Sequence, residues 1–445
     1  MQDLLKNAGQ RALEYAMKYN VQAEVYASSQ REMQIEAASH QVATLKEASE
    51  SGLAVRVVNG GRLGFAYTSD LKPDALHEAV DAAIAVSKFM PVDEHLQLTP
   101  AGLAYPQLDT YDDVIGQRTV KEKISLVFEA EAIAQGTDRR IAVIERSVFE
   151  EKESRLAICN SLGLDVYGQG NYCSLYLYAV AREDGDAQGG FGSMSRRRYD
   201  ELDARQVGNE AAQRALRSLK ARSMASATLP CVLEPYVAVK FLGLLARMVD
   251  GEAVLKGKSL LGDKLGRNVA ADCLTVVDDA TLSGGLATFP FDDEGVPAQK
   301  QTLIEKGGLK GFLYNNQAAH RAGADSTGHA QRMSYRSLPS ISPSNLTISA
   351  GNVNDKDMLG VAKGLYVTDL MGLHTANPVS GDFSLGASGM LIENGRLSYP
   401  VRGMVVAGNM IQLLQDIEAV GNKLRFYGSR GAPSLRVSAL SIAGD

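Results

Sequence analysis

Cysteine is scarce in this sequence, which limits the fold classes that the chain can adopt. Only four of the 445 residues are cysteine, at Cys159, Cys173, Cys231 and Cys273, and no C-x-x-C pair occurs. A disulfide scaffold or a zinc knuckle requires paired, closely spaced cysteines. We therefore expect free thiols in a reducing compartment.

Long apolar runs are also missing. No segment approaches the roughly 18 uncharged apolar residues of a membrane-spanning helix, and the first 20 residues are interrupted by Asp3, Lys6, Arg11 and Glu14. These charges interrupt the apolar region that a signal peptide needs. The sequence thus predicts a cytoplasmic protein without membrane contacts.

Positive charge is not in excess. The chain has 46 Lys and Arg against 52 Asp and Glu, a formal charge of −6. Nucleic-acid binding depends on clustered cations that displace condensed counterions, so this balance argues against a nucleic-acid partner. The one basic triplet, Arg196 to Arg198, is followed by Asp200 and Glu201 and is predicted to be a solvated loop.

The composition that remains is typical of a soluble globular protein. Apolar residues make up 45% and charged residues 22% of the chain, which excludes disordered and collagen-like classes. At about 150 residues per domain, the length predicts more than one hydrophobic core.

Hydrophobic periodicity in the first half predicts helices and antiparallel strands. Apolar residues at helical spacing predict helices near 1–20, 70–87, 119–136 and 203–221, and alternating residues predict strands between them. Asn59-Gly60-Gly61 indicates a hairpin turn. We also expect turns at 160–163 and 168–170 and a long surface connection over 91–115.

The residue composition and the hydrophobic pattern change after residue 222. The small, polar run 221–230 predicts a boundary between an N-terminal domain, 1–222, and a C-terminal domain, 223–445. One apolar helix near 235–250 is followed by short segments with many glycines. The predicted fold class is α+β: antiparallel strands with helices on one side, then a β-rich barrel-like or sandwich-like domain.

Several apparent motifs lack a required residue. The run Gly251 to Lys258 has one residue too many for a phosphate-binding loop, and 386–389 is one residue short of a nucleophile elbow. His77-Glu78 lacks the second histidine of a zinc helix. We interpret 251–258, 386–389 and 168–170 as turns and His77 as an exposed helix start.

Two polar segments remain as candidate sites. The first, FDDEGVP (291–297), holds three adjacent carboxylates, Asp292, Asp293 and Glu294, between glycine and proline. Because such charges repel, they are either solvated or directed at a cation or an amine. The second runs from Asn315 to His329 and is rich in side chains that can hydrogen-bond a peptide backbone.

The second segment contains enough side chains of the types that bind a metal ion. His320, His329 and Asp325, with His374, supply ligand types that zinc accepts. The eight residues between the first two histidines define no local geometry, so spacing alone does not establish such a site.

The order of several motifs resembles that of the TldD/PmbA family, in its PmbA (TldE) branch. These motifs are CLTVVDD (273–279), FDDEGVP (291–297), LIEKGGLKGFL (303–313), VSGDFS (379–384), LIENG (391–395), VRG (401–403) and VGN (420–422). The resemblance covers nearly the whole chain and implies an N-terminal α+β domain and a C-terminal β-rich domain.

The resemblance also implies where the family's zinc ligands would lie. TldD subunits are zinc peptidases whose helix carries His-Glu, three residues, then His. The equivalent segment here is FLGLLA (241–246), without histidine or glutamate, and the later cysteine ligand would fall near Gly428 to Gly431, where no cysteine occurs. We therefore predict no metal site and no catalytic residue in this chain.

These points lead to a functional hypothesis. By resemblance, the chain is the non-metal subunit of a cytoplasmic TldD/TldE-like peptidase that acts on unfolded or extended peptides, and a TldD-like partner brings the zinc. The name "modulator of DNA gyrase" attached to this family is taken as an indirect effect of proteolysis. The alternatives are a homodimeric peptide-binding scaffold and a hydrolase with a metal at His320, His329 and Asp292.

The candidate loops are expected to contact the peptide and not to support the fold. The expected contact residues are Asp292, Asp293, Glu294, Asn315, Asn316, Gln317, His320 and His329. Because loops beside glycine and proline usually run on the surface, we expect exchange of Asp292 and Asp293 for asparagine to leave stability nearly unchanged.

Overall fold

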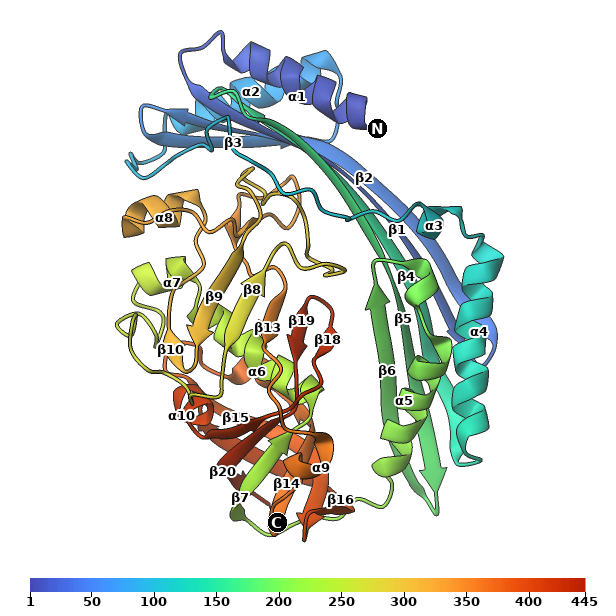
Figure 1. The fold of residues 1–445 in the computed structure, drawn as a ribbon. Coiled ribbons are helices and arrows are strands. Elements are labelled where there is room, and N and C mark those ends of the chain that lie inside the picture. Colours follow the sequence, from blue (N-terminus) through green and yellow to red (C-terminus); the bar gives the residue numbers. More distant parts are fainter. Residues whose placement is uncertain (445) are drawn as a thin grey trace.

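The N-terminal half of the chain forms one long, curved antiparallel sheet. In the computed structural model, which describes residues 1–444, the strand order is β3-β2-β1-β4-β5-β6. The four central strands run for 17 to 20 residues, and the sheet bends over the C-terminal half (Figure 1). The strands are β1 (Gln22–Ala38), β2 (Gln41–Asn59), β3 (Arg62–Thr68), β4 (Ile141–Asn160), β5 (Asp165–Glu183) and β6 (Asp186–Arg196).

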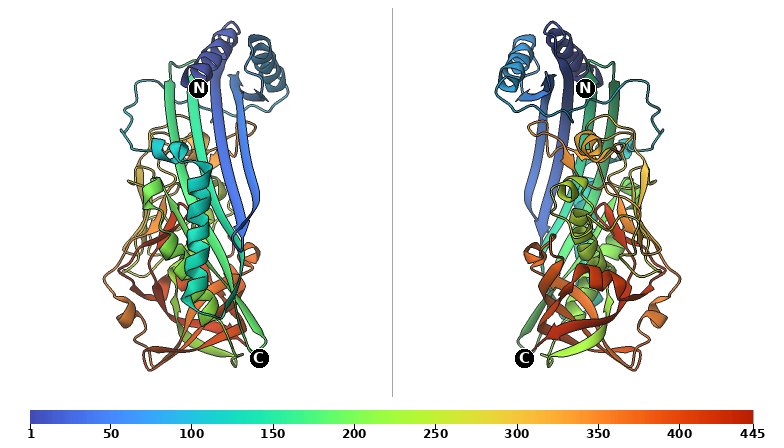
Figure 2. Two further views of the ribbon diagram at one scale, coloured as in Figure 1. Left: turned by 90° about the vertical axis from the view of Figure 1, so that its right-hand side faces the viewer. Right: turned by 90° about the vertical axis from the view of Figure 1, so that its left-hand side faces the viewer.

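Helices cover one face of this sheet in two groups. Figure 2 shows α1 and α2 at one end of the sheet and α4 farther along it. Apolar side chains of α1 and α2 pack mainly against β1 and β2, and those of α4 and α5 pack mainly against β4 and β5. A reciprocal capping box between Thr119 and Glu122 starts α4. The helices are α1 (Gln2–Ala16), α2 (Pro73–Ser87), α3 (Asp113–Gln117), α4 (Val120–Thr137) and α5 (Ala204–Arg217).

The C-terminal half contains two further six-stranded sheets. The first has the order β10-β9-β8-β13-β19-β18. In the second, β16-β15-β14-β7-β20-β17, an additional pairing of β16 with β20 closes a five-strand barrel. The strands are β7 (Ala227–Leu233), β8 (Val276–Asp279), β9 (Lys300–Glu305), β10 (Gly308–Leu309), β13 (Leu346–Ile348), β14 (Lys363–Met371), β15 (Asp382–Glu393), β16 (Arg396–Asn409), β17 (Ile417–Val420), β18 (Arg425–Tyr427), β19 (Arg430–Ala432) and β20 (Leu435–Ala443).

Helix α6 (Pro235–Met248) is the centre of this half. Nine of its fourteen residues are buried, and they contribute to the largest hydrophobic core of the chain as described. The remaining elements are the short ribbon of β11 (Ala330–Gln331) and β12 (Ser340–Ile341) and the helices α7 (Gly251–Leu255), α8 (Asn316–Ala322), α9 (Asp355–Met358) and α10 (Met410–Gln415).

The structure confirms the predicted fold class and most predicted elements. The N-terminal half is antiparallel with helices on one side, and the C-terminal half is rich in strands and contains a barrel. Residues 218–226 connect α5 to β7, and the division at residue 222 stays a prediction. None of the helices in residues 1–444 is long and apolar enough to cross a membrane.

Three of the segments predicted to be turns lie wholly or partly in helices or strands, and one of them, 251–258, begins with helix α7. Gly60 and Gly61 do form the hairpin between β2 and β3, with φ of 55° and 71°. Gly168 to Gly170, however, lies inside β5, where a Cβ atom on Gly168 would be 2.6 Å from the Phe289 ring. Residues 386–389 likewise lie inside β15. The glycines of 168–170 therefore allow the C-terminal half to approach the sheet and do not reverse the chain.

Candidate functional site

The three adjacent carboxylates are not on the surface. Asp292 and Glu294 are 9% and 0% exposed, and Asp293 is partly buried between the two halves of the molecule. The expectation of an exposed loop is therefore wrong. The physical reason is that each carboxylate has a partner distant in the sequence. Asp292 and Asp293 accept hydrogen bonds from the backbone amides of Ala330 and Arg332, and Glu294 accepts from Arg56, 238 residues away.

Glu294 belongs to a buried network that we call the charged contact. Arg56 of β2 donates to Glu294 at 2.6 Å and to Glu24 of β1 at 2.8 Å, and Arg332 donates to Glu24 at 2.9 Å. All four side chains, Glu24, Arg56, Glu294 and Arg332, are less than 9% exposed. Two cations and two anions from both halves thus neutralise one another, and the nearby carboxylates keep the pKa of Arg56 above its usual value despite burial.

Asp292 and Asp293 organise the backbone of the loop. Asp292 accepts hydrogen bonds from the amides of Glu294, Val296 and Ala330, each at 2.9 Å. Asp293 accepts from the Arg332 amide at 2.6 Å and from the Tyr26 hydroxyl at 3.3 Å. Burial raises the pKa of Asp292 well above its ordinary value, with a further rise from the Glu294 charge, and burial raises the pKa of Asp293 to about 6.

A cavity of about 490 Å³ lies between the concave face of the N-terminal sheet and these loops. Tyr26 and Tyr172 line it from the sheet, and Asp292, Asp293 and His329 line it from the C-terminal half. Three of the eight predicted contact residues are therefore together at one cavity. Their role toward a peptide stays a prediction.

Arg197 also lines this cavity, and its position corrects the interpretation of the basic triplet. Its guanidinium is buried and donates to five backbone carbonyls, those of Thr110, Asn171, Gly285, Leu286 and Thr288, at 2.6 to 3.1 Å. The prediction of a solvated loop is therefore wrong for Arg197. Burial lowers the pKa of Arg197 to about 10, and the carbonyl oxygens satisfy its donors.

Thr327, His329 and Asp278 form a hydroxyl–imidazole–carboxylate chain like a proton relay, but the imidazole ring is buried. Its Nδ1 lies 2.9 Å from Thr327 Oγ1 and its Nε2 lies 2.9 Å from Asp278 Oδ1. The ring is 2% exposed, and the Thr327 hydroxyl also contacts the backbone of Tyr314. Because both ring nitrogens are occupied inside the protein, His329 is free neither to activate a nucleophile nor to bind a metal in this arrangement.

The other predicted contact residues lie on a different side of the carboxylate loop. Asn315 caps α8, and the backbone amide of Asn316 donates to Glu294 at 2.8 Å. Gln317 donates to Asp93 at 2.7 Å, and the His320 ring packs edge-on against His95. The structure thus places Asn315, Asn316, Gln317 and His320 against the connection at 93–99 and away from the cavity residues.

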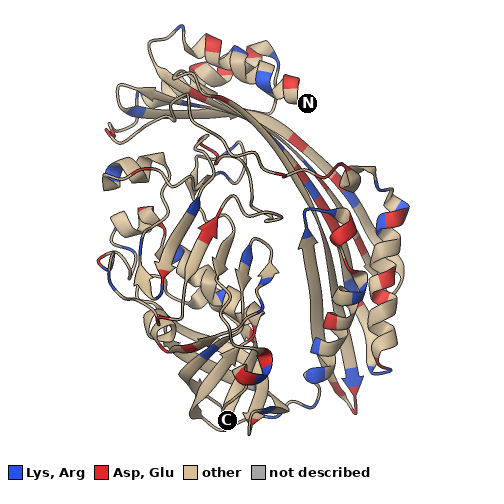
Figure 3. Cartoon of the chain, in the orientation of Figure 1, with Lys and Arg blue, Asp and Glu red and all other residues tan. Residues whose placement is uncertain are grey.

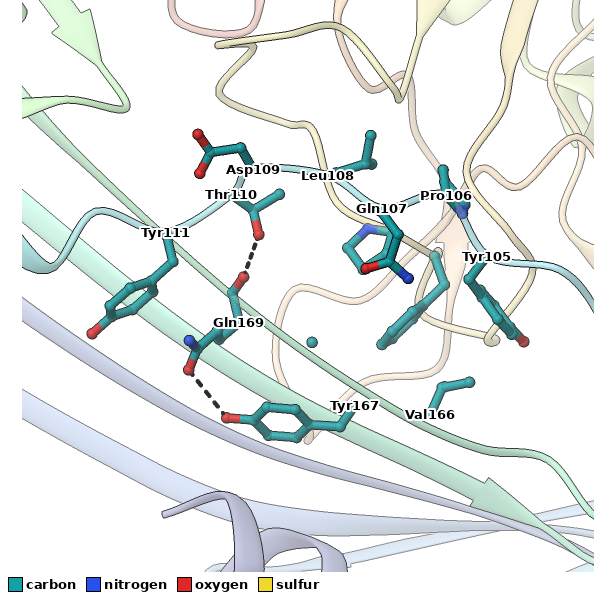
Figure 4. Close-up of a pocket in the computed structure, with 13 residues that line it drawn as sticks. Tyr105, Pro106, Gln107, Leu108, Asp109, Thr110, Tyr111, Val166, Tyr167 and Gln169 are labelled. Atoms are coloured by element: carbon teal, nitrogen blue, oxygen red, sulfur yellow. Dashed lines mark hydrogen bonds between the residues drawn. The ribbon is translucent and has the colours of Figure 1, made fainter.

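A second cavity, of about 410 Å³, lies beside the edge of β5 (Figure 4). Residues 105–111 form its rim, 166–169 of β5 form its floor, and Pro290 and Phe291 close one side. The Asn171 amide donates to the Thr110 carbonyl at 3.1 Å, and the Thr110 hydroxyl donates to the Gln169 carbonyl at 2.6 Å. The connection therefore pairs with β5 only at residues 169–171.

The same cavity leaves a short strand edge without a partner. β6 pairs with β5 only from Cys173 onward. Backbone groups of alternate residues point to the same side of a strand, so those of Tyr167 point the same way as those of Gln169 and Asn171. Within residues 1–444, the N–H and C=O of Tyr167 have no partner at this edge. This edge was not indicated by the sequence, because it depends on where β6 ends.

The segment equivalent to the zinc helix is part of the hydrophobic core. Phe241, Leu242 and Ala246 are 2%, 1% and 6% exposed, and the Phe241 ring packs edge-on against Phe383 at 5.1 Å. Apolar side chains offer no donor atoms, so these positions do not fit a zinc ion. Residues 1–444 also contain no group of three His, Cys, Asp or Glu side chains placed to hold a metal.

The halves meet a second time at what we call the aromatic contact. Its members are Phe191 of β6, Arg214 of α5, Tyr236 of α6 and Tyr427 of β18. The Phe191 and Tyr236 rings are 4.8 Å apart, and the Arg214 guanidinium lies 4.3 Å from the Phe191 ring centre. Arg214 also bonds Glu210 at 3.0 Å and the Tyr427 hydroxyl at 3.0 Å.

Charged residues of both signs are interspersed along the helices and strands of both halves (Figure 3). The sequence did not indicate that Arg56 and Arg332 are buried, because a single arginine in a strand or loop gives no sign of burial. Arg197 was predicted to be solvated because it lies in a basic triplet followed by acidic residues.

Comparison with known proteins gives matches along nearly the whole chain. Residues 23–87 match domain 1 of the PmbA/TldA metallopeptidases, 114–219 match the central domain, and 226–444 match the C-terminal domain. The chain is 30% identical to metalloprotease PmbA of Escherichia coli O157:H7, over 99% of this chain and 96% of that protein. It is 27% identical to a metalloprotease PmbA homolog of Haemophilus influenzae, over 99% and 96%.

Solved structures share the fold. A Thermotoga maritima protein named as a modulator of a DNA gyrase superposes with a TM-score of 0.91 at 27% identity, covering 98% of this chain and 99% of that one. TldE from Thermococcus kodakarensis superposes with a TM-score of 0.91 at 25% identity, covering 98% and 100%. The similarity therefore includes both halves and their relative placement.

Proposed function

Because this chain belongs to the PmbA/TldD metallopeptidase family, we propose that it is the non-metal subunit of a cytoplasmic TldD/TldE-type peptidase. In this proposal, the chain binds unfolded or extended peptides, and a TldD-like partner in a heterodimer supplies zinc and cleavage. Self-association as a homodimer is the alternative assembly.

One observation carries the non-metal assignment. The helix that would present metal ligands to a substrate instead directs Phe241, Leu242 and Ala246 into the core of the C-terminal half. Introducing ligands there would require polar groups in a packed, apolar interior, which is costly unless each group finds a partner. Phe241, Leu242 and Ala246 thus contribute to the hydrophobic core.

Peptide binding is supported by the two cavities between the halves. The cavity at Asp292 and Asp293 offers carboxylates and tyrosines, and the cavity at Tyr167 offers an unpaired strand edge. An extended peptide commonly adds to such an edge through its own backbone, with side chains entering neighbouring pockets. One peptide residue opposite Tyr167 could pair with both of its free backbone groups.

The test of the non-metal role is reconstitution with the family's metal-bearing partner. We expect the purified chain to hold far less than one zinc per molecule and to leave an unstructured peptide intact, because it lacks an activated water. The mixture with a TldD-like protein should cleave the peptide and lose activity with a chelator. Robust, chelator-sensitive cleavage by this chain alone would contradict the proposal, and failure of the two proteins to associate would favour a homodimeric scaffold.

The test of the peptide path is a substitution that fills the first cavity. Ser154 lines that cavity from β4, and Ser154→Tyr should reduce peptide turnover by the reconstituted complex at nearly unchanged melting temperature. The matched control is Ser125→Tyr on the exposed side of α4. Equal turnover by the two variants would place the peptide elsewhere.

A further inference from the structure

Arg430, in β19, is a partly buried cation without a counter-ion. Within residues 1–444, its guanidinium makes no ion pair and no hydrogen bond, and neither does that of Arg247 on α6. The other buried arginines differ: Arg56 and Arg332 pair with carboxylates, and Arg197 bonds carbonyls. A half-desolvated cation beside a like charge is unfavourable unless an anion joins it.

The carboxylates that pair with another cation of α6 and with β18 do not pair with Arg430. Asp369 pairs with Lys240 of α6 at 2.6 Å, and Glu210 pairs with Arg214 at 3.0 Å and also with Arg425 of β18. Both carboxylates are therefore already neutralised by other cations. Burial, and to a smaller extent the charge of Arg247, lower the pKa of Arg430.

A glycine makes room for this guanidinium. A Cβ atom on Gly243 would lie only 2.9 Å from Arg430 Nη1, so any larger residue would displace it. Gly243 and Arg247 are four residues apart on the partly exposed face of α6, while Phe241, Leu242 and Leu245 point into the core. The arrangement therefore holds Arg430 over α6 with Arg247 on the same face.

We propose that Arg430 and Arg247 form a binding site for the C-terminal carboxylate of a bound peptide. The planar fork of a guanidinium matches a carboxylate with two parallel hydrogen bonds, and the second arginine adds attraction. The terminal carboxylate is the one anion present in every peptide regardless of sequence. This inference rests on the proposed peptide-binding function.

The site lies where the family resemblance places metal ligands. α6 and β19, which the family resemblance singled out for metal ligands, pack against each other in this chain. Here the same place holds the Arg430 guanidinium, which lies against Gly243 of α6. The chain thus has the positive charge of Arg430, which could bind a carboxylate, at a place where it has no metal ligands.

The direct experiment observes the arginine itself. Side-chain NMR of the full chain labelled at arginine should show a shift of the Arg430 Nε signal, assigned with Arg430→Lys, when acetyl-trialanine acid is added. The C-terminal amide of the same peptide should leave the signal in place, because it carries no charge. No shift with the acid would overturn the site.

Peptide affinity gives the second measurement. For a labelled, extended peptide acid, Arg430→Gln should weaken binding about tenfold or more, as expected for a charge-assisted bidentate contact, and the amide should bind both proteins alike. Gly243→Ala should weaken acid binding similarly while keeping every charge. Alanine also favours a helix over glycine, so a loss of folding would not explain the result. Arg396→Gln, an exposed arginine on β16, is the matched control.

The outcomes separate this inference from the proposed function. If the acid shifts Arg430 but the extended peptide neither binds nor is cleaved by the complex, the carboxylate site stands and the peptidase role fails. If peptides bind and wild-type protein does not distinguish acid from amide, the carboxylate site is wrong. If Arg430→Gln weakens only association with the partner protein, the carboxylate belongs to that protein and the proposal is overturned.

Discussion

The charged contact and the aromatic contact both join the halves through arginine, but the surroundings of the arginine differ. In the charged contact, Arg56 is the only cation bonded to Glu294, which is fully buried. In the aromatic contact, Glu234 pairs with both Arg214 and Arg217, and Glu210 pairs with both Arg214 and Arg425. Arg214 is also covered by the faces of aromatic rings.

The number of partners that remain determines how much stability is lost when one member of a buried ion pair is removed. Removing one partner of a buried pair is costly mainly because the other charge stays behind without water. Where each carboxylate has a second cation, the same removal leaves no bare charge. The number of remaining partners, and not the number of bonds lost, should therefore set the order of the effects.

The largest effect is expected for Arg56→Met. Glu294 would remain buried without a cation, so the free energy of unfolding should fall by about 3–5 kcal/mol, measured by urea unfolding against Arg396→Met. A second change, Glu294→Gln, should recover part of the loss because it removes the stranded charge. A loss below about 1 kcal/mol for Arg56→Met would show that leaving Glu294 without a cation costs little stability, and the two contacts would then not differ in this way.

The next effect concerns the pH dependence of stability at Asp293, which accepts a hydrogen bond from the backbone amide of Arg332, a member of the charged contact. The pKa of Asp293 is raised to about 6 in the folded protein, so its stabilising contribution is full below its unfolded pKa near 4 and is lost as pH rises through about 6. The stability of wild type relative to Asp293→Asn should therefore fall between pH 4 and 6, by at most about 1.4 kcal/mol per pH unit. Urea midpoints over this range test it, and parallel pH curves would contradict it.

A smaller effect is expected for Arg214→Met. Glu210 and Glu234 keep Arg425 and Arg217, so the loss is limited to the ring contacts and packing, about 1–2 kcal/mol. The same urea assay applies, with Arg396→Met again as reference. A loss equal to that of Arg56→Met would show that the second cations offer no protection.

The smallest effect is expected for Tyr427→Phe. This change removes the hydroxyl that accepts from Arg214 at 3.0 Å but keeps the ring. One net hydrogen bond corresponds to about 0.5–1.5 kcal/mol, and Arg214 retains its carboxylates. Combined with Arg214→Met, the two losses should be less than additive, since they remove a shared interaction.

The sequence predicted what depends on neighbours along the chain. Alternation over 21–27 and the Asn59-Gly60-Gly61 turn predicted the first strands and their hairpin, because strand faces and tight turns are set by local spacing. Alternation also indicated that Glu24 and Tyr26 share a face. It could not indicate what covers that face, since the covering residues begin near Asp292.

The site was less predictable for the same reason. Asp292 to Glu294 looked like a surface loop because their sequence neighbours are polar or turn-forming, whereas Arg56 is 238 residues away from Glu294. Arg430 faces Gly243 across nearly as long a separation. Burial of a charge depends on such distant partners, and no single-sequence pattern encodes them.

The carbonyl groups that accept hydrogen bonds from Arg197 have a consequence for folding during synthesis. Thr110 and Asn171 precede Arg197 on the nascent chain, but Gly285, Leu286 and Thr288 follow it by about ninety residues. At several residues per second, the ribosome would need some seconds to deliver them. During that interval, the strands of the curved sheet would be complete, but the Arg197 guanidinium would lack three of its five carbonyl partners and would be open to water or to a chaperone.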